Sequence, residues 1–162
     1  MQQTKTTLTK PSDLELVFTR IFDAPRDLVF KAWTEPEHVV KWWGPNGFST
    51  TSLEMNVKPG GTWRLVMHGP DGTDYKNRIV YMEVVKPERL VYRHVGEEGE
   101  GEEQVQMHVV VTFEAIGKQT KVSMQMVFGS AEERTRVIEK YGADKGAVET
   151  LQRLADYLDG IN

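Results

Sequence analysis

The sequence contains no cysteine. A disulfide-linked scaffold, a thiolate metal site and a cysteine nucleophile are therefore excluded. The 162 residues also contain no apolar run that approaches the roughly 20 residues needed to span a membrane. Residues 1–12 are polar and rich in threonine, and they lack the apolar core of a secretory signal. We expect a cytoplasmic protein without a membrane span, in which residues 1–12 form a flexible tail.

Positive charge is scarce as well. The chain has 20 Lys and Arg against 24 Asp and Glu, a net charge of -4. A dedicated nucleic-acid binder carries a basic face, so we expect no nucleic-acid partner. The motifs of nucleophilic serine hydrolases and of phosphate-binding loops are absent. We predict no metal, no cofactor and no catalytic residue, and we favour a protein that is not an enzyme.

The hydrophobic pattern divides the chain into segments of different period. Residues 14–22 alternate and predict a strand, and Asp23-Ala24-Pro25 then opens a short helix with Asp23 as its expected cap. A second short helix ends at Gly44-Pro45. After this helix, apolar residues recur at every second position, which predicts strands joined by short turns. The six predicted strands are residues 53–57, 63–67, 74–85, 90–94, 105–113 and 122–128.

Residues 130–158 return to helical spacing. Ser130 and Glu133 stand at the spacing of a capping box, and Gly142 predicts a break. One apolar stripe follows the helix, made of Ala143, Ala147, Val148, Leu151, Leu154, Ala155 and Leu158. The glutamate-rich stretch at residues 96–103 is typical of a solvated hairpin tip.

This order predicts an α+β fold in which residues 13–160 form a single domain. Its core is a curved antiparallel sheet of six to seven strands, with two short helices and a long C-terminal helix. An uncovered edge strand would permit pairing between copies, so monomer and homodimer both stay open.

A single helix covers only part of such a sheet, and the remaining space is either filled by large side chains or kept as a cavity. Several large side chains stand at the alternating positions of their strands that are otherwise apolar, so they should face the interior. Tyr92 and His94 would add polar groups to this apolar lining. The candidate lining residues are Trp63, Met67, Tyr92, His94, Met107, Val109, Met124 and Met126, with Leu151 from the helix. The alternative is that the methionines only fill the core.

Two further candidates depend on the direction of single side chains. We expect Trp43 to be buried and to line the cavity, and Trp42 to be partly exposed. Glu83 should point outward, which places Arg78 inward, where it would need a carboxylate or an acidic ligand group. Alternatively, Arg78 reaches water from a frayed strand end. His68 and His94 are the histidines nearest to such a site; we expect the other two, His38 and His108, to be exposed.

Four motifs resemble the SRPBCC/START-like superfamily, and in particular its branch homologous to the C-terminal domain of heat-shock protein 90 ATPase activators. They are Asp23-Ala24-Pro25, Trp42-Trp43-Gly44-Pro45, Pro59-Gly60-Gly61 and Pro87-Glu88-Arg89-Leu90, and the final helix adds to the match. The resemblance covers residues 14–158. It implies a helix-grip fold with a cavity between the sheet and the C-terminal helix.

The resemblance leaves three functional hypotheses. The first is binding of a hydrophobic, aromatic or lipid-like small molecule in the cavity. The second is a chaperone-activating interaction domain, with a partner surface near Trp42. The third is a cyclase- or hydrolase-type enzyme that uses Tyr92, His94 and Arg78 in the same pocket.

Overall fold

The computed structural model describes residues 5–95 and 107–161. Its strands are β1 (Thr7–Thr9), β2 (Glu15–Phe22), β3 (Ser49–Met55), β4 (Thr62–His68), β5 (Asp74–Val85), β6 (Arg89–Val95), β7 (Met107–Ile116) and β8 (Gln119–Phe128). Its helices are α1 (Arg26–Thr34), α2 (Pro36–Val39), α3 (Ala131–Tyr141) and α4 (Ala143–Ile161). The expected hairpin tip at residues 96–103 and the apolar position Val105 lie outside the described residues.

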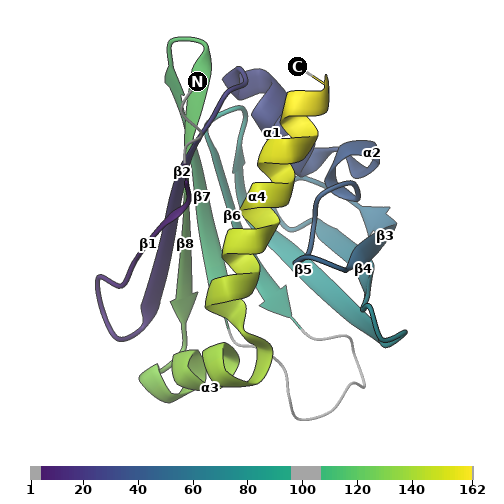
Figure 1. The fold of residues 1–162 in the computed structure, drawn as a ribbon, viewed down its shortest axis with the longest axis vertical. Helices are drawn as coiled ribbons and strands as arrows, with labels where there is room; N and C mark the ends of the chain where they lie inside the picture. The colour runs from purple at the N-terminus through teal and green to yellow at the C-terminus, as the bar shows by residue number, and fades with distance from the viewer. Residues whose placement is uncertain (1–4, 96–106, 162) are drawn as a thin grey trace.

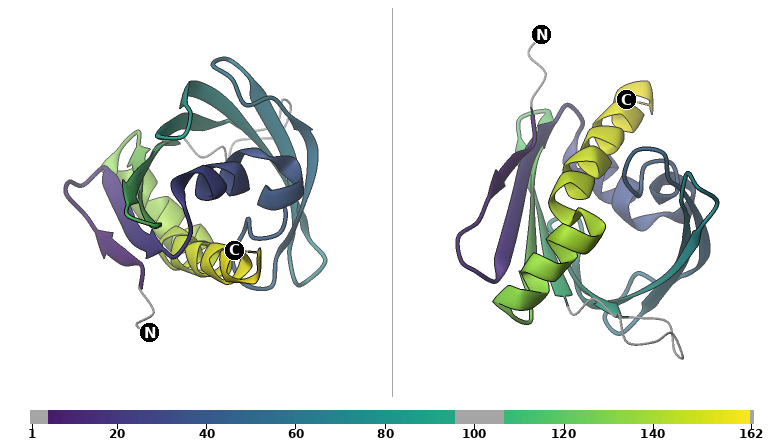
Figure 2. Two further views of the ribbon diagram at one scale, coloured as in Figure 1. Left: turned by 90° about the horizontal axis from the view of Figure 1, so that it is seen from above. Right: turned by 60° about the horizontal axis from the view of Figure 1, so that its bottom comes forward.

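All eight strands form one antiparallel sheet in the order β1-β2-β8-β7-β6-β5-β4-β3. Helix α4 crosses one face of the sheet (Figure 1), and the sheet curls around α1 and α2 (Figure 2). The predicted α+β fold is confirmed, with eight strands rather than six or seven. The additional strand is β1, which pairs with β2 inside the stretch that we expected to be a tail.

The alternation of apolar residues explains how the sheet and α4 pack. In β2, every second residue from Leu16 to Phe22 is buried, and the residues that alternate with them are half-buried on the other face. Helix α4 buries Ala147, Leu151, Leu154 and Leu158, which recur every three or four residues. These two surfaces meet in one hydrophobic core. Among the described helices, none has the length and apolarity that a membrane crossing requires.

The ends of the helices follow local chemistry. The Ser130 hydroxyl accepts a hydrogen bond from the Glu133 backbone N–H (3.0 Å), which confirms the predicted cap of α3. Gly142 takes the left-handed conformation (φ 61°) and separates α3 from α4, as its position predicted. The expectation that Asp23 caps α1 is wrong, because Pro25 occupies the N-cap position and provides no side-chain hydrogen bond.

A β-bulge reverses the expected direction of Arg78. Tyr81 pairs with Tyr92, but Glu83 pairs with Val91, so Met82 is an extra residue in β5. One extra residue flips every preceding side chain to the other face. Ile79 and Tyr81 are therefore buried, and Arg78 lies half-buried on the outer face of the sheet. The expectation that Arg78 lines an interior cavity is wrong.

The expected burial of Trp42 and Trp43 is also wrong, because the structure exchanges the two. Trp42 is fully buried (0% exposed), packs edge-on against Trp33 and donates from its indole N–H to the Ala32 carbonyl (2.9 Å). Trp43 is half-buried and packs against Trp63, with 4.8 Å between ring centroids. Helix α1 supplies the contacts that bury Trp42, and nothing in the local pattern of α2 indicates where α1 lies.

Candidate functional site

The inner face of the sheet divides into a packed region and a more open end. Trp63, Tyr92 and Val109 are each at most 2% exposed, and Leu151 of α4 is 1% exposed. These side chains have no room beside them for a ligand. Four other predicted lining residues are only half-buried, namely Met67, His94, Met107 and Met126, while Met124 is buried. Any site on the inner face therefore lies toward these half-buried residues.

A recess of about 270 Å³ lies where β6, β7 and β8 adjoin. We call it the β6–β8 recess. His94 and Met107 are directly opposite each other across β6 and β7, and Phe128 is opposite Met107 on β8. The described residues that line the recess are Arg93, His94, Val95, Met107, His108, Val127, Phe128 and Gly129. Of the predicted site residues, His94 and Met107 are brought together here, and the others are not.

His94 is the polar group of greatest interest in the recess. Its ring packs edge-on against Tyr92, with 5.9 Å between centroids, and Ile79 lies opposite it on β5. Within the described residues, neither ring nitrogen of His94 has a hydrogen-bond partner. Burial lowers the pKa of His94 from its usual 6.5 to about 4. The imidazole is therefore uncharged at neutral pH, with one donor and one acceptor nitrogen.

Tyr92 does not act as a hydrogen-bond partner or as a base beside His94. Burial raises the pKa of the Tyr92 hydroxyl, and a contact with the Trp33 indole offsets a small part of that rise. Tyr92 also stacks edge-on with Tyr81, whose pKa burial raises as well. Both phenols stay protonated at neutral pH. Among the described residues, Tyr92 and His94 meet through their rings and no hydrogen bond joins them.

Protonation of His94 should lower stability in acid. Unfolded His94 titrates near 6.5 and folded His94 near 4, so the unfolded chain takes up the proton first as the pH falls. The contribution of this group to stability is complete above about pH 6.5 and is lost between about pH 6.5 and pH 4. An NMR titration of the imidazole protons, assigned with His94→Phe, should give a midpoint near 4. A midpoint near 6.5 would show that the ring is solvated.

The other histidines make contacts that the sequence did not indicate. His38 is half-buried rather than exposed, and its Nδ1 hydrogen-bonds to the Tyr157 hydroxyl of α4 (2.6 Å). His108 is also half-buried, on the outer face. His68 lies on the outer face between Thr51 (2.8 Å) and Asp74 (2.7 Å). This threonine–histidine–aspartate chain is exposed to water and is not among the residues that line the β6–β8 recess.

Arg20 is the buried charge that the sequence analysis missed. It is 5% exposed, on the same side of β2 as Leu16 and Phe18, and its guanidinium donates to Gln152 Oε1 of α4 (3.0 Å). Burial lowers the pKa of Arg20, and Asp156 partly opposes that shift. The alternation of buried positions along β2 could have predicted that Arg20 faces the interior. Its contacts hold α4 to the sheet, away from the β6–β8 recess.

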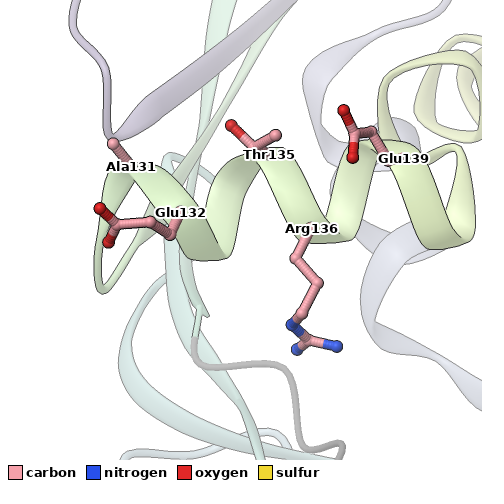
Figure 3. A pocket seen from close by; sticks show the side chains of 5 residues that line it. All are labelled: Ala131, Glu132, Thr135, Arg136 and Glu139. Carbon is pink, nitrogen blue, oxygen red and sulfur yellow. The ribbon is translucent and has the colours of Figure 1, made fainter.

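A second depression, of about 400 Å³, is lined by residues of α3 within the part of the chain that the structure describes. Figure 3 shows that Arg136 points away from Thr135 and Glu139, so these side chains do not converge on one ligand. Arg136 is also paired with Glu133. Across residues 5–95 and 107–161, no group of three or more histidine, aspartate and glutamate side chains is arranged to hold a metal. The β6–β8 recess is the better candidate.

Comparison with known families agrees with this geometry at the level of the fold. Residues 23–159 match the family model described as Activator of Hsp90 ATPase homolog 1-like protein. The chain belongs to this family. No functionally curated protein matches the sequence. The family assignment also agrees with the resemblance to the SRPBCC/START-like superfamily.

Solved structures resemble this member of the family along nearly its whole length. An NMR structure of a protein from Arthrobacter aurescens is 23% identical with a TM-score of 0.87, over 95% of this chain and 91% of that chain. A crystal structure from Mycobacterium smegmatis is 24% identical with a TM-score of 0.85, over 97% and 99%. A Silicibacter pomeroyi protein described as AHSA1 is 20% identical with a TM-score of 0.75, over 91% and 99%. These likenesses show the fold alone.

Proposed function

We propose that this protein binds an apolar small molecule in the β6–β8 recess. The observation that carries the proposal is the recess itself, where the half-buried His94 imidazole, which has no hydrogen-bond partner among the described residues, lies beside Met107 and Phe128. A pocket with few polar groups in a partly apolar lining is typical of ligand sites. A ligand in the recess would contact both the imidazole and the apolar side chains.

The lining of the recess fits an apolar guest. Met107 and Phe128 face the interior side, whereas Val95 and Val127 contribute apolar surface from the outer face at the strand ends. Methionine adapts its shape and makes favourable contacts with aromatic rings. A volume of about 270 Å³ lies just below the range of roughly 300–1,000 Å³ that is usual for ligand pockets. The recess therefore suits a small ligand better than a lipid chain.

Binding is favoured over catalysis by the chemistry of the same residues. A general base works best when its pKa lies near the working pH, and the pKa of His94 is about 4. No described carboxylate orients His94, and Tyr92 stays protonated. Arg78, the third residue of the enzyme hypothesis, lies on the outer face. This site can hold a molecule, but it lacks the groups to move a proton efficiently.

Stimulation of a chaperone is the second candidate, because the family is described by that activity. The partner surface that we expected at Trp42 is not available, since that side chain is fully buried. Trp43 packs on Trp63, and Arg153 donates to the carbonyls of Gly44 (2.7 Å) and Pro45 (3.1 Å) beside it. This segment serves the fold, so we place chaperone stimulation behind ligand binding.

Nile red, an uncharged dye that fluoresces in apolar surroundings, tests the proposal directly. We expect the purified protein to bind the dye, and propylbenzene to displace it. Met107→Trp should fill the recess and weaken dye binding by about tenfold, the equivalent of about 1.4 kcal/mol. The matched control is Met82→Trp, because Met82 is 52% exposed on the outside of β5. Equal binding by both variants, or no binding by the wild-type protein, would contradict the proposal.

A further inference from the structure

Three polar side chains form a continuous hydrogen-bonded chain on the outer face of β3, β4 and β5. Thr51 Oγ1 lies 2.8 Å from His68 Nε2, and His68 Nδ1 lies 2.7 Å from Asp74 Oδ1. An ionised carboxylate can only accept a hydrogen bond, so the proton of the neutral imidazole belongs on Nδ1. The bare Nε2 then accepts from the Thr51 hydroxyl. Hydroxyl, imidazole and carboxylate stand in the order of a nucleophile, its base and the group that orients the base.

The pairing of the strands holds these three groups together. His68 ends β4 and Asp74 begins β5, and the two residues are directly opposite each other. The hairpin between them is closed by the Gly69 backbone N–H, which donates to the Thr73 carbonyl (2.7 Å). Thr51 on β3 lies diagonally across from His68 and on the same face. Positions 51, 68 and 74 match no sequence motif, because only the register of the sheet brings them together.

The Thr51 hydroxyl can be reached by another molecule. Thr51 is exposed, and β3 is the last strand of the sheet, with no described strand beyond it. Every second backbone N–H of such an edge strand points away from the sheet, and in β3 no described residue accepts from these groups. They supply donors near Thr51 for a carbonyl oxygen that becomes negative. The His68 and Asp74 side chains are 37% and 60% exposed, so this open surface suits a short acyl group.

We propose that Thr51, His68 and Asp74 cleave small carboxylic esters by acyl transfer to Thr51. The Thr51 oxygen attacks the ester carbonyl carbon while its proton passes to His68 Nε2. The bond from that carbon to the alcohol oxygen then breaks, and His68 gives the proton to the leaving alcohol. Water attacks the acyl-threonine in the same way, which releases the acid and restores the hydroxyl. Thr51 and His68 are the catalytic residues, and Asp74 is a positioning residue.

Para-nitrophenyl acetate tests this inference with the full-length protein, because its cleavage releases a coloured product. Nitrophenolate is a much better leaving group than the Thr51 alkoxide, so we expect a burst of colour and an acetyl group on Thr51, located by peptide mass spectrometry. Thr51→Val should abolish the burst, and Thr51→Ser should retain it. His68→Gln should slow acetylation of Thr51 by about 100-fold, the lower end of what general-base catalysis contributes. Thr7→Val, at an exposed threonine of β1, is the matched control and should keep the burst.

Asp74 needs a readout that separates positioning from packing. Asp74→Asn should slow acetylation of Thr51 by about tenfold or more, because the amide no longer fixes the proton on His68 Nδ1. Asp74→Glu restores the carboxylate and should recover part of the rate, which a merely structural role would not predict. Equal rates for Asp74→Asn and the wild-type protein would overturn the triad as a unit.

Two further results would overturn the inference. One is acetylation of lysine or histidine side chains alone, with Thr51 unmodified in the wild-type protein. The other is an unchanged rate of Thr51 acetylation in His68→Gln. All three positions lie at the surface, so far-ultraviolet circular dichroism should show that each variant folds. None of them lines the β6–β8 recess, so Nile red binding by these variants should equal that of the wild-type protein, and the two proposals stand or fail separately.

Discussion

Trp42→Ala is expected to lower the free energy of unfolding by about 3–5 kcal/mol, the range for removal of a buried aromatic side chain. Trp42 is fully buried, packs edge-on against Trp33 and donates to the Ala32 carbonyl. The substitution would leave a cavity between α1 and the turn that follows α2, and it would remove the indole donor to that carbonyl. Denaturant unfolding, followed by far-ultraviolet circular dichroism, measures the change. If Trp42→Ala does not fold, Trp42→Phe provides a smaller truncation at the same position.

The matched control is the next residue. Trp43 is half-buried, and its main described ring contacts are with Trp42 and Trp63. We expect Trp43→Ala to cost about 1–2 kcal/mol, within the usual range for single substitutions. The order of the two costs is what matters. If Trp43→Ala proved more damaging than Trp42→Ala, the packing of α1 on α2 described here would be wrong.

The contrast between these two residues shows where sequence-based prediction fails. The spacing of apolar residues predicts a short helix up to Gly44, on which Trp42 and Trp43 would point about 100° apart, but α2 ends at Val39 and both tryptophans follow it. The choice between them depends on the position of α1, which provides Trp33 and the Ala32 carbonyl. Those contacts form only after folding, and a local pattern carries no information about them.

Arg78 shows that a local pattern is also insufficient to predict which face of a strand a side chain occupies. Working backward from Glu83 gives the correct face only if β5 is regular, and the bulge at Met82 shifts the register by one residue. In β6, no bulge separates Leu90, Tyr92 and His94, and all three lie on the inner face as predicted. Two local signals were dependable as well, because Ser130 begins α3 and Gly142 ends it for reasons contained in a few residues, whereas the expected Asp23 cap of α1 was wrong.

The openness of the site could not be predicted. His94 and Met107 share an apolar parity with Trp63 and Val109, and the sequence gives no reason to separate the two pairs. In the structure, Trp63 and Val109 are packed, while His94 and Met107 lie beside a recess. The difference depends on the register of β6, β7 and β8 and on where those strands end. Register is fixed by the pairing of the whole sheet, so a prediction from single strands overestimates the size of the site.

Leu151→Ala tests whether the packed region and the recess are separate. Leu151 is 1% exposed and lies in the middle of the apolar stripe of α4. Its truncation should lower the free energy of unfolding by about 2–5 kcal/mol, because α4 cannot collapse fully into the space left on the sheet. Leu53→Ala is the matched control, since Leu53 is 64% exposed at a bulge in β3 and should change stability by less than about 0.5 kcal/mol.

The same pair of variants also locates the ligand. Leu151 is not among the described residues that line the β6–β8 recess, so folded Leu151→Ala protein should bind Nile red with nearly the wild-type affinity. A ligand held between α4 and the middle of the sheet would instead meet the new space beside Trp63 and Val109, and its affinity would change several-fold. A large change in affinity would place the site beneath α4, whereas a large loss of stability with unchanged affinity would place it at the β6–β8 recess.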